Sequence, residues 1–67
     1  MKSYTMNAAE VKRYNSEDES VTRDMFSDIM RKLGYKYNNQ PDEDCTETME
    51  IYHPEGYVAA VFYIAKK

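Results

Sequence analysis

The chain has few of the residues that most catalytic, metal and cofactor sites need. Its 67 residues include one cysteine, one histidine, two glycines and no tryptophan. A single cysteine cannot form an internal disulfide, and two isolated glycines cannot build a phosphate-binding loop. No apolar run approaches the roughly 18 residues of a membrane span, and no signal-peptide-like run follows Met1. We therefore expect a cytoplasmic protein without a membrane segment or a nucleotide cofactor.

Basic residues are scarce in the middle of the chain. Residues 17–50 hold ten acidic and four basic side chains, and the whole chain has a net charge of −3. Because nucleic-acid binding normally shows as a basic patch, this acidic excess disfavours a nucleic-acid ligand. It favours a cationic protein partner, or serves solubility alone. By analogy, the acidic middle looks like that of small viral inhibitors of host proteins, which present carboxylates where nucleic-acid phosphates would sit.

The residues that could carry catalysis or bind a metal are poorly placed. Cys45 and His53 provide the only thiol and imidazole, and in one extended strand they lie about 26 Å apart, too far for a nucleophile and its base. A calcium loop that starts at Asp42 would need glycine and glutamate where the chain has Glu47 and His53. We therefore predict no catalytic residue, metal site, cofactor or small-molecule substrate. Cys45 should be semi-buried, and His53 should be a solvent-exposed turn residue.

One segment has clear helical periodicity. Between residues 17 and 34, apolar side chains recur at helical spacing at Val21, Met25, Phe26, Ile29, Met30 and Leu33. Either Ser16 or Ser20 could cap the start of this helix, and Gly34 can adopt the left-handed conformation that ends it. We expect Phe26, Ile29 and Leu33 to be buried together with apolar residues of the strands, namely Ile51, Phe62 and Ile64.

The C-terminal third predicts a β-hairpin. Two runs rich in β-branched and aromatic residues flank the turn sequence HPEG at residues 53–56. If Tyr52 faces Tyr57, Glu50 pairs with Ala59, Thr48 with Val61 and Thr46 with Tyr63. These eight residues share one face, and the more apolar opposite face should meet the helix; it comprises Met49, Ile51, Val58, Ala60, Phe62 and Ile64.

The N-terminal residues 2–14 allow two interpretations. Tyr4, Met6 and Ala8 alternate as in a strand that begins near Lys2, whereas Ala8, Val11 and Tyr14 form a helical face that Asn7 or Thr5 could cap. We favour the strand. The predicted fold is a single α+β domain, residues 1–67, with one amphipathic helix on a small antiparallel sheet; the alternative is a winged helix-turn-helix.

These patterns favour a small non-enzymatic interaction or inhibitor module. Tyrosine is enriched at protein interfaces, and the predicted interface lies on the sheet face turned away from the helix: Tyr52, Tyr57, Tyr63, Val61, Thr48 and Glu50. Its partner would be another protein or a second copy of the chain, unless the N-terminal segment covers this face. The alternative function is a winged-helix nucleic-acid-binding regulator, in which Arg23, Arg31, Lys32 and Lys36 reach DNA.

Overall fold

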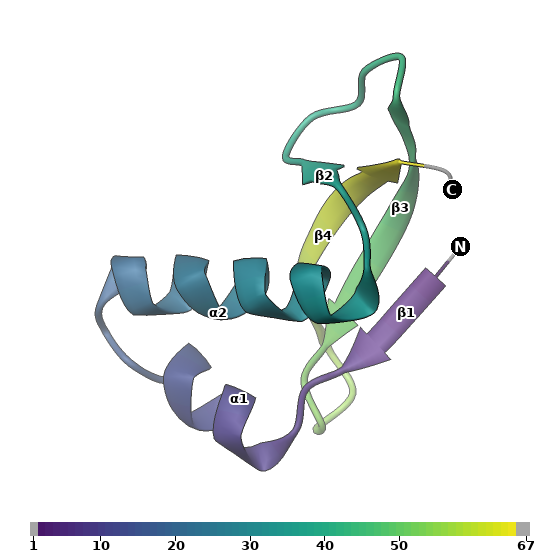
Figure 1. Ribbon diagram of the computed structural model, residues 1–67. Coiled ribbons are helices and arrows are strands. Elements are labelled where there is room, and N and C mark those ends of the chain that lie inside the picture. Colours follow the sequence, from purple (N-terminus) through teal and green to yellow (C-terminus); the bar gives the residue numbers. More distant parts are fainter. Residues whose placement is uncertain (1, 66–67) are drawn as a thin grey trace.

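The protein consists of two helices on one face of a four-stranded sheet (Figure 1). The computed structural model describes residues 2–65. The elements are β1 (Lys2–Thr5), α1 (Ala8–Tyr14), α2 (Glu19–Leu33), β2 (Tyr37–Asn38), β3 (Cys45–Tyr52) and β4 (Val58–Ala65). The strand order is β1-β3-β4-β2; β1 is parallel to β3, and the other pairs are antiparallel. The predicted α+β class is confirmed, but the sheet is mixed and contains a parallel strand where we expected only antiparallel ones.

The N-terminal segment is both a strand and a helix. As predicted, a strand begins at Lys2, and β1 pairs in parallel with β3 so that Tyr4 lies beside Ile51. The helical interpretation is also correct for the residues that follow. Asn7 caps α1 by accepting a hydrogen bond from the backbone N–H of Glu10, and the Glu10 carboxylate accepts one from the backbone N–H of Asn7. This reciprocal pair satisfies two N–H groups that the first turn otherwise leaves free.

The N-cap of helix α2 is not one of the two residues that we predicted. Asp18, rather than Ser16 or Ser20, is the N-cap, and its Oδ1 accepts the Ser20 backbone N–H at 2.9 Å. The Ser20 hydroxyl also donates a hydrogen bond to this oxygen, at 2.7 Å. Both hydrogen bonds lower the pKa of Asp18, and the one from the hydroxyl has the larger effect. The predicted end is confirmed, since Gly34 has a φ of 84°, a conformation that costs glycine little.

The hairpin differs in register from the one we predicted. Thr48 pairs with Tyr63 and Glu50 with Val61, which is a shift of two residues from the expected partners. A shift of two leaves each side chain on its predicted face, because side chains along a strand alternate with a period of two. The predicted division into two faces therefore holds for residues 47–52 of β3, whereas a register shift between Cys45 and Glu47 leaves Thr46 outside the predicted pairing with Tyr63.

A bulge near the turn reverses the direction of Val58 in β4. Ile51 pairs with Ala60 but Tyr52 pairs with Val58, so one extra residue lies on β4 between these pairs. An extra residue inverts the alternation beyond it. Consequently Val58, which we predicted to face the helix, lies opposite Tyr52 and is 41% exposed.

The core lies between the sheet and the helices, and methionines contribute much of it. Its fully or nearly fully buried hydrophobic members are Met6, Met25, Ile29, Met30, Met49, Ile51 and Ile64. Six side chains were predicted to be buried, and three of them are buried: Ile29, Ile51 and Ile64. The remaining three, Phe26, Leu33 and Phe62, pack against this cluster but are only partly buried. Flexible methionine side chains reach the centre that we had assigned to these residues.

A polar cluster joins the first three elements. The Tyr4 hydroxyl donates to the Glu10 carboxylate at 2.9 Å and lies 2.7 Å from the Lys32 ammonium, which donates to it. This hydrogen bond to Tyr4 is the main cause of a raised Lys32 pKa. Because Tyr4, Glu10 and Lys32 belong to β1, α1 and α2 respectively, the cluster fixes the N-terminal segment to the helices.

The winged-helix alternative is not the observed arrangement. It required a helical N-terminal segment and a hairpin that projects as a wing. Instead, residues 2–5 form a strand, and β3 and β4 are the two central strands of the sheet. The loop predicted between helix and hairpin also contains a short edge strand, β2, which pairs with β4 at Tyr63 and Ile64.

Candidate protein-interaction surface

One face of the sheet is covered by neither of the helices in residues 2–65. Both α1 and α2 lie against the opposite face, as Figure 1 shows. The register places on this uncovered side the side chains that alternate with the buried Met49, Ile51 and Ile64. We call this surface the open face and define it by Ser3, Thr5, Thr48, Glu50, Tyr52, Val58, Val61 and Tyr63.

Five of the six residues predicted at the interface lie on the open face. Thr48 is directly opposite Tyr63, Glu50 is opposite Val61, and Tyr52 ends the same row of β3. Val61 is 46% exposed, and its neighbour Val58 is 41% exposed. The open face is therefore a contiguous surface on which Val58 and Val61 are exposed and Tyr52 and Tyr63 are partly buried.

Glu50 is the charged residue of the open face, and it is held in place. Its Oε1 accepts a hydrogen bond from the Tyr52 hydroxyl at 2.9 Å. This hydrogen bond and the carboxylate charge raise the pKa of Tyr52, since both oppose formation of a phenolate. The pair therefore presents an anionic carboxylate next to a neutral tyrosine ring.

Tyr57, the sixth predicted residue, lies elsewhere. Its ring stacks on His53, with centroids 4.7 Å apart and an interplanar angle of 8°, and His53 in turn lies near Tyr14 of α1. Partial burial is the main cause of the raised Tyr57 pKa. The β4 bulge explains this position, because it turns Tyr57 away from Tyr52. The three tyrosines therefore do not form one patch.

His53 is buried, so our expectation of a solvated turn residue was wrong. It is 8% exposed, and its Nδ1 accepts the backbone N–H of Glu55 at 3.1 Å. His53 therefore closes the turn and anchors it against Tyr14, a role that the isolated turn sequence does not indicate.

Cys45 is fully buried at the other end of β3. Burial raises the pKa of its thiol, and the nearby Asp42 carboxylate adds to this effect. A buried thiol with a raised pKa is a poor nucleophile, because the thiolate is the reactive form. Among the described residues, no group of three or more histidine, cysteine, aspartate or glutamate side chains is placed to hold a metal ion.

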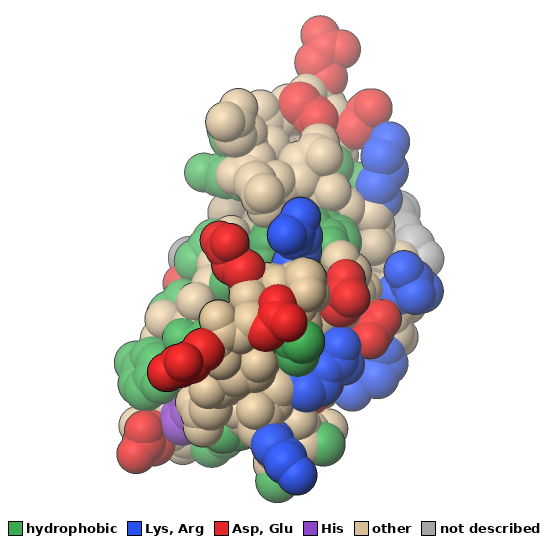
Figure 2. Space-filling model, turned by 90° about the vertical axis from the view of Figure 1, so that its left-hand side faces the viewer, with side chains coloured by type: hydrophobic (Ala, Val, Ile, Leu, Met, Phe, Trp, Pro, Cys, Tyr) green, Lys and Arg blue, Asp and Glu red, His purple; other side chains and the backbone are tan. Residues whose placement is uncertain are grey.

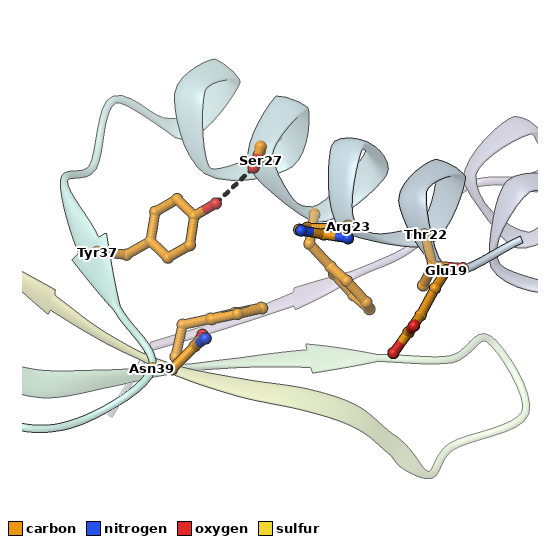
Figure 3. Close-up of a pocket in the computed structure, with 8 residues that line it drawn as sticks. Glu19, Thr22, Arg23, Ser27, Tyr37 and Asn39 are labelled. Carbon is orange, nitrogen blue, oxygen red and sulfur yellow. Dashed lines mark hydrogen bonds between the residues drawn. The ribbon is translucent and has the colours of Figure 1, made fainter.

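A second surface feature, which we did not predict, is a groove beside α2. It has a volume of about 420 Å³ and lies between the first half of α2 and the edge formed by β4 and β2. In Figure 3, Glu19, Thr22 and Arg23 extend from the helix toward it, and Ser27 is joined to Tyr37 by a hydrogen bond of 2.6 Å. No direct signal for this groove is present in the sequence: Phe26 and Phe62 have core spacing, but both are only partly buried.

Charges of both signs are mixed on the side of the molecule where α2 begins. Figure 2 shows acidic and basic side chains next to one another there, without a large basic patch. Asp28 of α2 pairs with Arg13 at 3.2 Å and with Arg31 at 3.6 Å. Arg31 was a candidate for DNA contact, and its pairing reduces the charge available for phosphate binding.

Comparison with family models, with curated proteins and with solved structures found no match for this chain. In the described part of the chain, neither helix combines the length and apolar character that crossing a membrane requires.

Proposed function

We propose that this chain is a non-enzymatic protein-interaction module that binds its partner through the open face. The observation that supports it is the exposure of Val58 and Val61 on a sheet face that no described helix covers. An antiparallel sheet with one solvated face normally alternates hydrophobic residues inward with polar residues outward. Here the outward set includes Tyr52, Tyr63 and two valines, which is the composition of a surface that loses contact with water on binding.

The chemistry of the open face indicates the kind of partner. Glu50 places one carboxylate among uncharged side chains, and Tyr52 holds it in position. A partner surface with aliphatic groups around a lysine or arginine would complement it. A second copy would fit less well, because self-association through this face would bring two Glu50 carboxylates toward each other. We therefore propose a different protein as the partner.

An inhibitory role is a more specific form of this proposal. Asp42, Glu43 and Asp44 are exposed in the loop that precedes β3. The backbone N–H groups of Asp44 and Cys45 both donate to Asp42 Oδ1, so this acidic loop has a defined conformation. Together with Glu50, it would cover a cationic surface of the partner and block other anionic ligands. This function requires no catalytic residue.

The test compares substitutions on the two sides of the molecule. The chain and two arginine variants, Val61→Arg and Asp24→Arg, are immobilised and used to isolate binding proteins from the source organism for quantitative mass spectrometry. Asp24 is an exposed residue of α2 and serves as the control. We expect a protein that binds the parent and Asp24→Arg but not Val61→Arg. For that protein, Tyr63→Ser should weaken binding by about 2 kcal/mol, roughly thirtyfold in Kd.

Two results would contradict the proposal. One is a set of bound proteins that is identical for all three chains, which would show that the open face makes no contribution. The other is tight binding of duplex DNA at low salt that Val61→Arg leaves unchanged. Light scattering during size exclusion distinguishes a second copy as partner, since a dimer of the parent would become a monomer in Val61→Arg.

A further inference from the structure

The outer edge of β4 is paired along only part of its length. Strand β2 contributes two residues, Tyr37 and Asn38, which pair with Ile64 and Tyr63. The chain then leaves the sheet, and Asp42 stabilises the following loop by accepting the N–H groups of Asp44 and Cys45. Within residues 2–65, no strand lies beside the first part of β4 on this side. The sheet therefore has an open edge next to β2.

The hydrogen bonds between β2 and β4 determine which β4 backbone groups face this edge. The Ala65 N–H donates to the Lys36 carbonyl oxygen at 2.9 Å, so Ala65 directs its N–H toward β2. Every second residue of a strand directs its N–H and C=O to the same side. By this alternation, Val61 directs its N–H and C=O outward beyond the end of β2. Among the described residues, no backbone group pairs with Val61 there.

The groove lies beside this open edge. Phe62 of β4, Phe26 of α2 and Tyr37 of β2 all line it. The Phe62 ring centroid lies 5.4 Å from that of Phe26 and 5.1 Å from that of Tyr37, and all three side chains are only partly buried. An extended chain paired with β4 would therefore have an aromatic surface on its helix-facing side. The first half of α2 forms the opposite wall of the groove.

The rim of the groove carries two charges with a definite spacing. Glu19 and Arg23 both line it, and neither forms an ion pair with another described side chain. Residues four apart on a helix are separated by about 6 Å along its axis. Residues two apart in an extended chain are separated by about 6.6 Å and lie on the same side. An extended segment with a basic and an acidic residue two positions apart would thus complement both charges.

We propose that the open edge of β4 and the adjoining groove bind an extended segment of a partner protein as a fifth strand. The segment pairs with the backbone of Val61 and places an apolar side chain against Phe26 and Phe62. A lysine or arginine faces Glu19, and an aspartate or glutamate two residues away faces Arg23. This mode of recognition uses backbone hydrogen bonds for affinity and alternate side chains for specificity. It does not depend on the open face.

The probe for this site is a phage-displayed library of random nine-residue peptides, selected on the full chain. We expect enriched peptides to share an apolar residue and two opposite charges spaced by two positions. A synthetic peptide of the enriched sequence is then titrated against Val61→Pro and Val61→Thr. Both variants remove the valine side chain, but only proline removes the outward N–H. We expect binding to weaken at least about tenfold in Val61→Pro and to stay within about twofold of the parent in Val61→Thr.

A charge exchange provides an independent test if Val61→Pro does not fold. Glu19→Lys should weaken binding of the enriched peptide, and a peptide with its basic residue replaced by glutamate should restore it. Tyr63→Ser should leave peptide binding unchanged, which separates this site from the open face. The proposal is overturned if no sequence is enriched, or if Glu19→Lys has no effect on binding. It is also overturned if exchange of the Val61 amide slows with increasing concentration of the chain alone, which would show that a second copy occupies the edge.

Discussion

The exposure of the open face can be tested by comparing two conservative substitutions in adjacent strands. Ile51→Val removes one carbon from a side chain that is 0% exposed, and Val61→Thr changes a side chain that is 46% exposed. Both variants keep a β-branched residue in a strand, so strand propensity changes little. The comparison therefore measures burial on the two faces of the sheet.

The expected effects follow from burial. Removing one buried carbon costs about 0.8 kcal/mol in transfer free energy, and Ile-to-Val changes in cores typically cost about 0.5–1.5 kcal/mol. In a domain of this size, 1 kcal/mol lowers Tm by about 4–8 °C. A chain of 67 residues has a total free energy of unfolding of about 3–10 kcal/mol, so a loss of this free energy by about 1 kcal/mol is easily measured. Val61→Thr, on the exposed face, should change stability by no more than about 0.5 kcal/mol.

Thermal and urea unfolding followed by circular dichroism would measure both variants. The reasoning is refuted if Val61→Thr destabilises the chain as much as Ile51→Val, because a hydroxyl on an exposed valine position should cost little. Such a result would mean that the open face is covered in solution and forms a second core. Ile51→Ala should lower the free energy of unfolding by about 2–5 kcal/mol. It provides a reference for the effect of a large loss of buried apolar surface.

Three further predictions concern other parts of the structure. Asn7→Ala should lower the free energy of unfolding by about 1 kcal/mol in urea titrations, because it removes the cap of α1, whereas Gln40→Ala in an exposed loop should have no measurable effect. Because the folded-state pKa of Asp18 is lowered, its contribution to stability is present above the unfolded-state pKa and is lost as pH falls through the folded-state value. Asp18→Asn keeps a capping group without the titration, so its stability should fall less steeply below about pH 4 than that of the parent. Cys45 should react with a thiol reagent slowly in the folded chain and quickly in urea, and equal rates would show that its site is open to solvent.

Features that depend on local periodicity could be predicted from the amino-acid sequence. The spacing of apolar residues between 21 and 33 identified α2, and Gly34 identified its end. The HPEG turn and its flanking β-branched runs identified the hairpin. The division of β3 into two faces was also predictable, since it depends only on the alternation of side chains. For this reason Thr48, Glu50 and Tyr52 share one face, as expected, and their role in an interface stays a prediction.

Features that depend on a partner distant in the sequence became apparent only in the folded chain. The bulge between Val58 and Ala60 turned Tyr57 toward His53 and exposed Val58, because pairing with β3 left one residue of β4 without an opposite. His53 is buried because Tyr14 of α1 packs beside it. The open edge of β4 likewise exists because β2 is only two residues long. Strand periodicity is a property of the local chain, whereas pairing register, helix contacts and strand length are selected by the packing of the whole sheet against its helices.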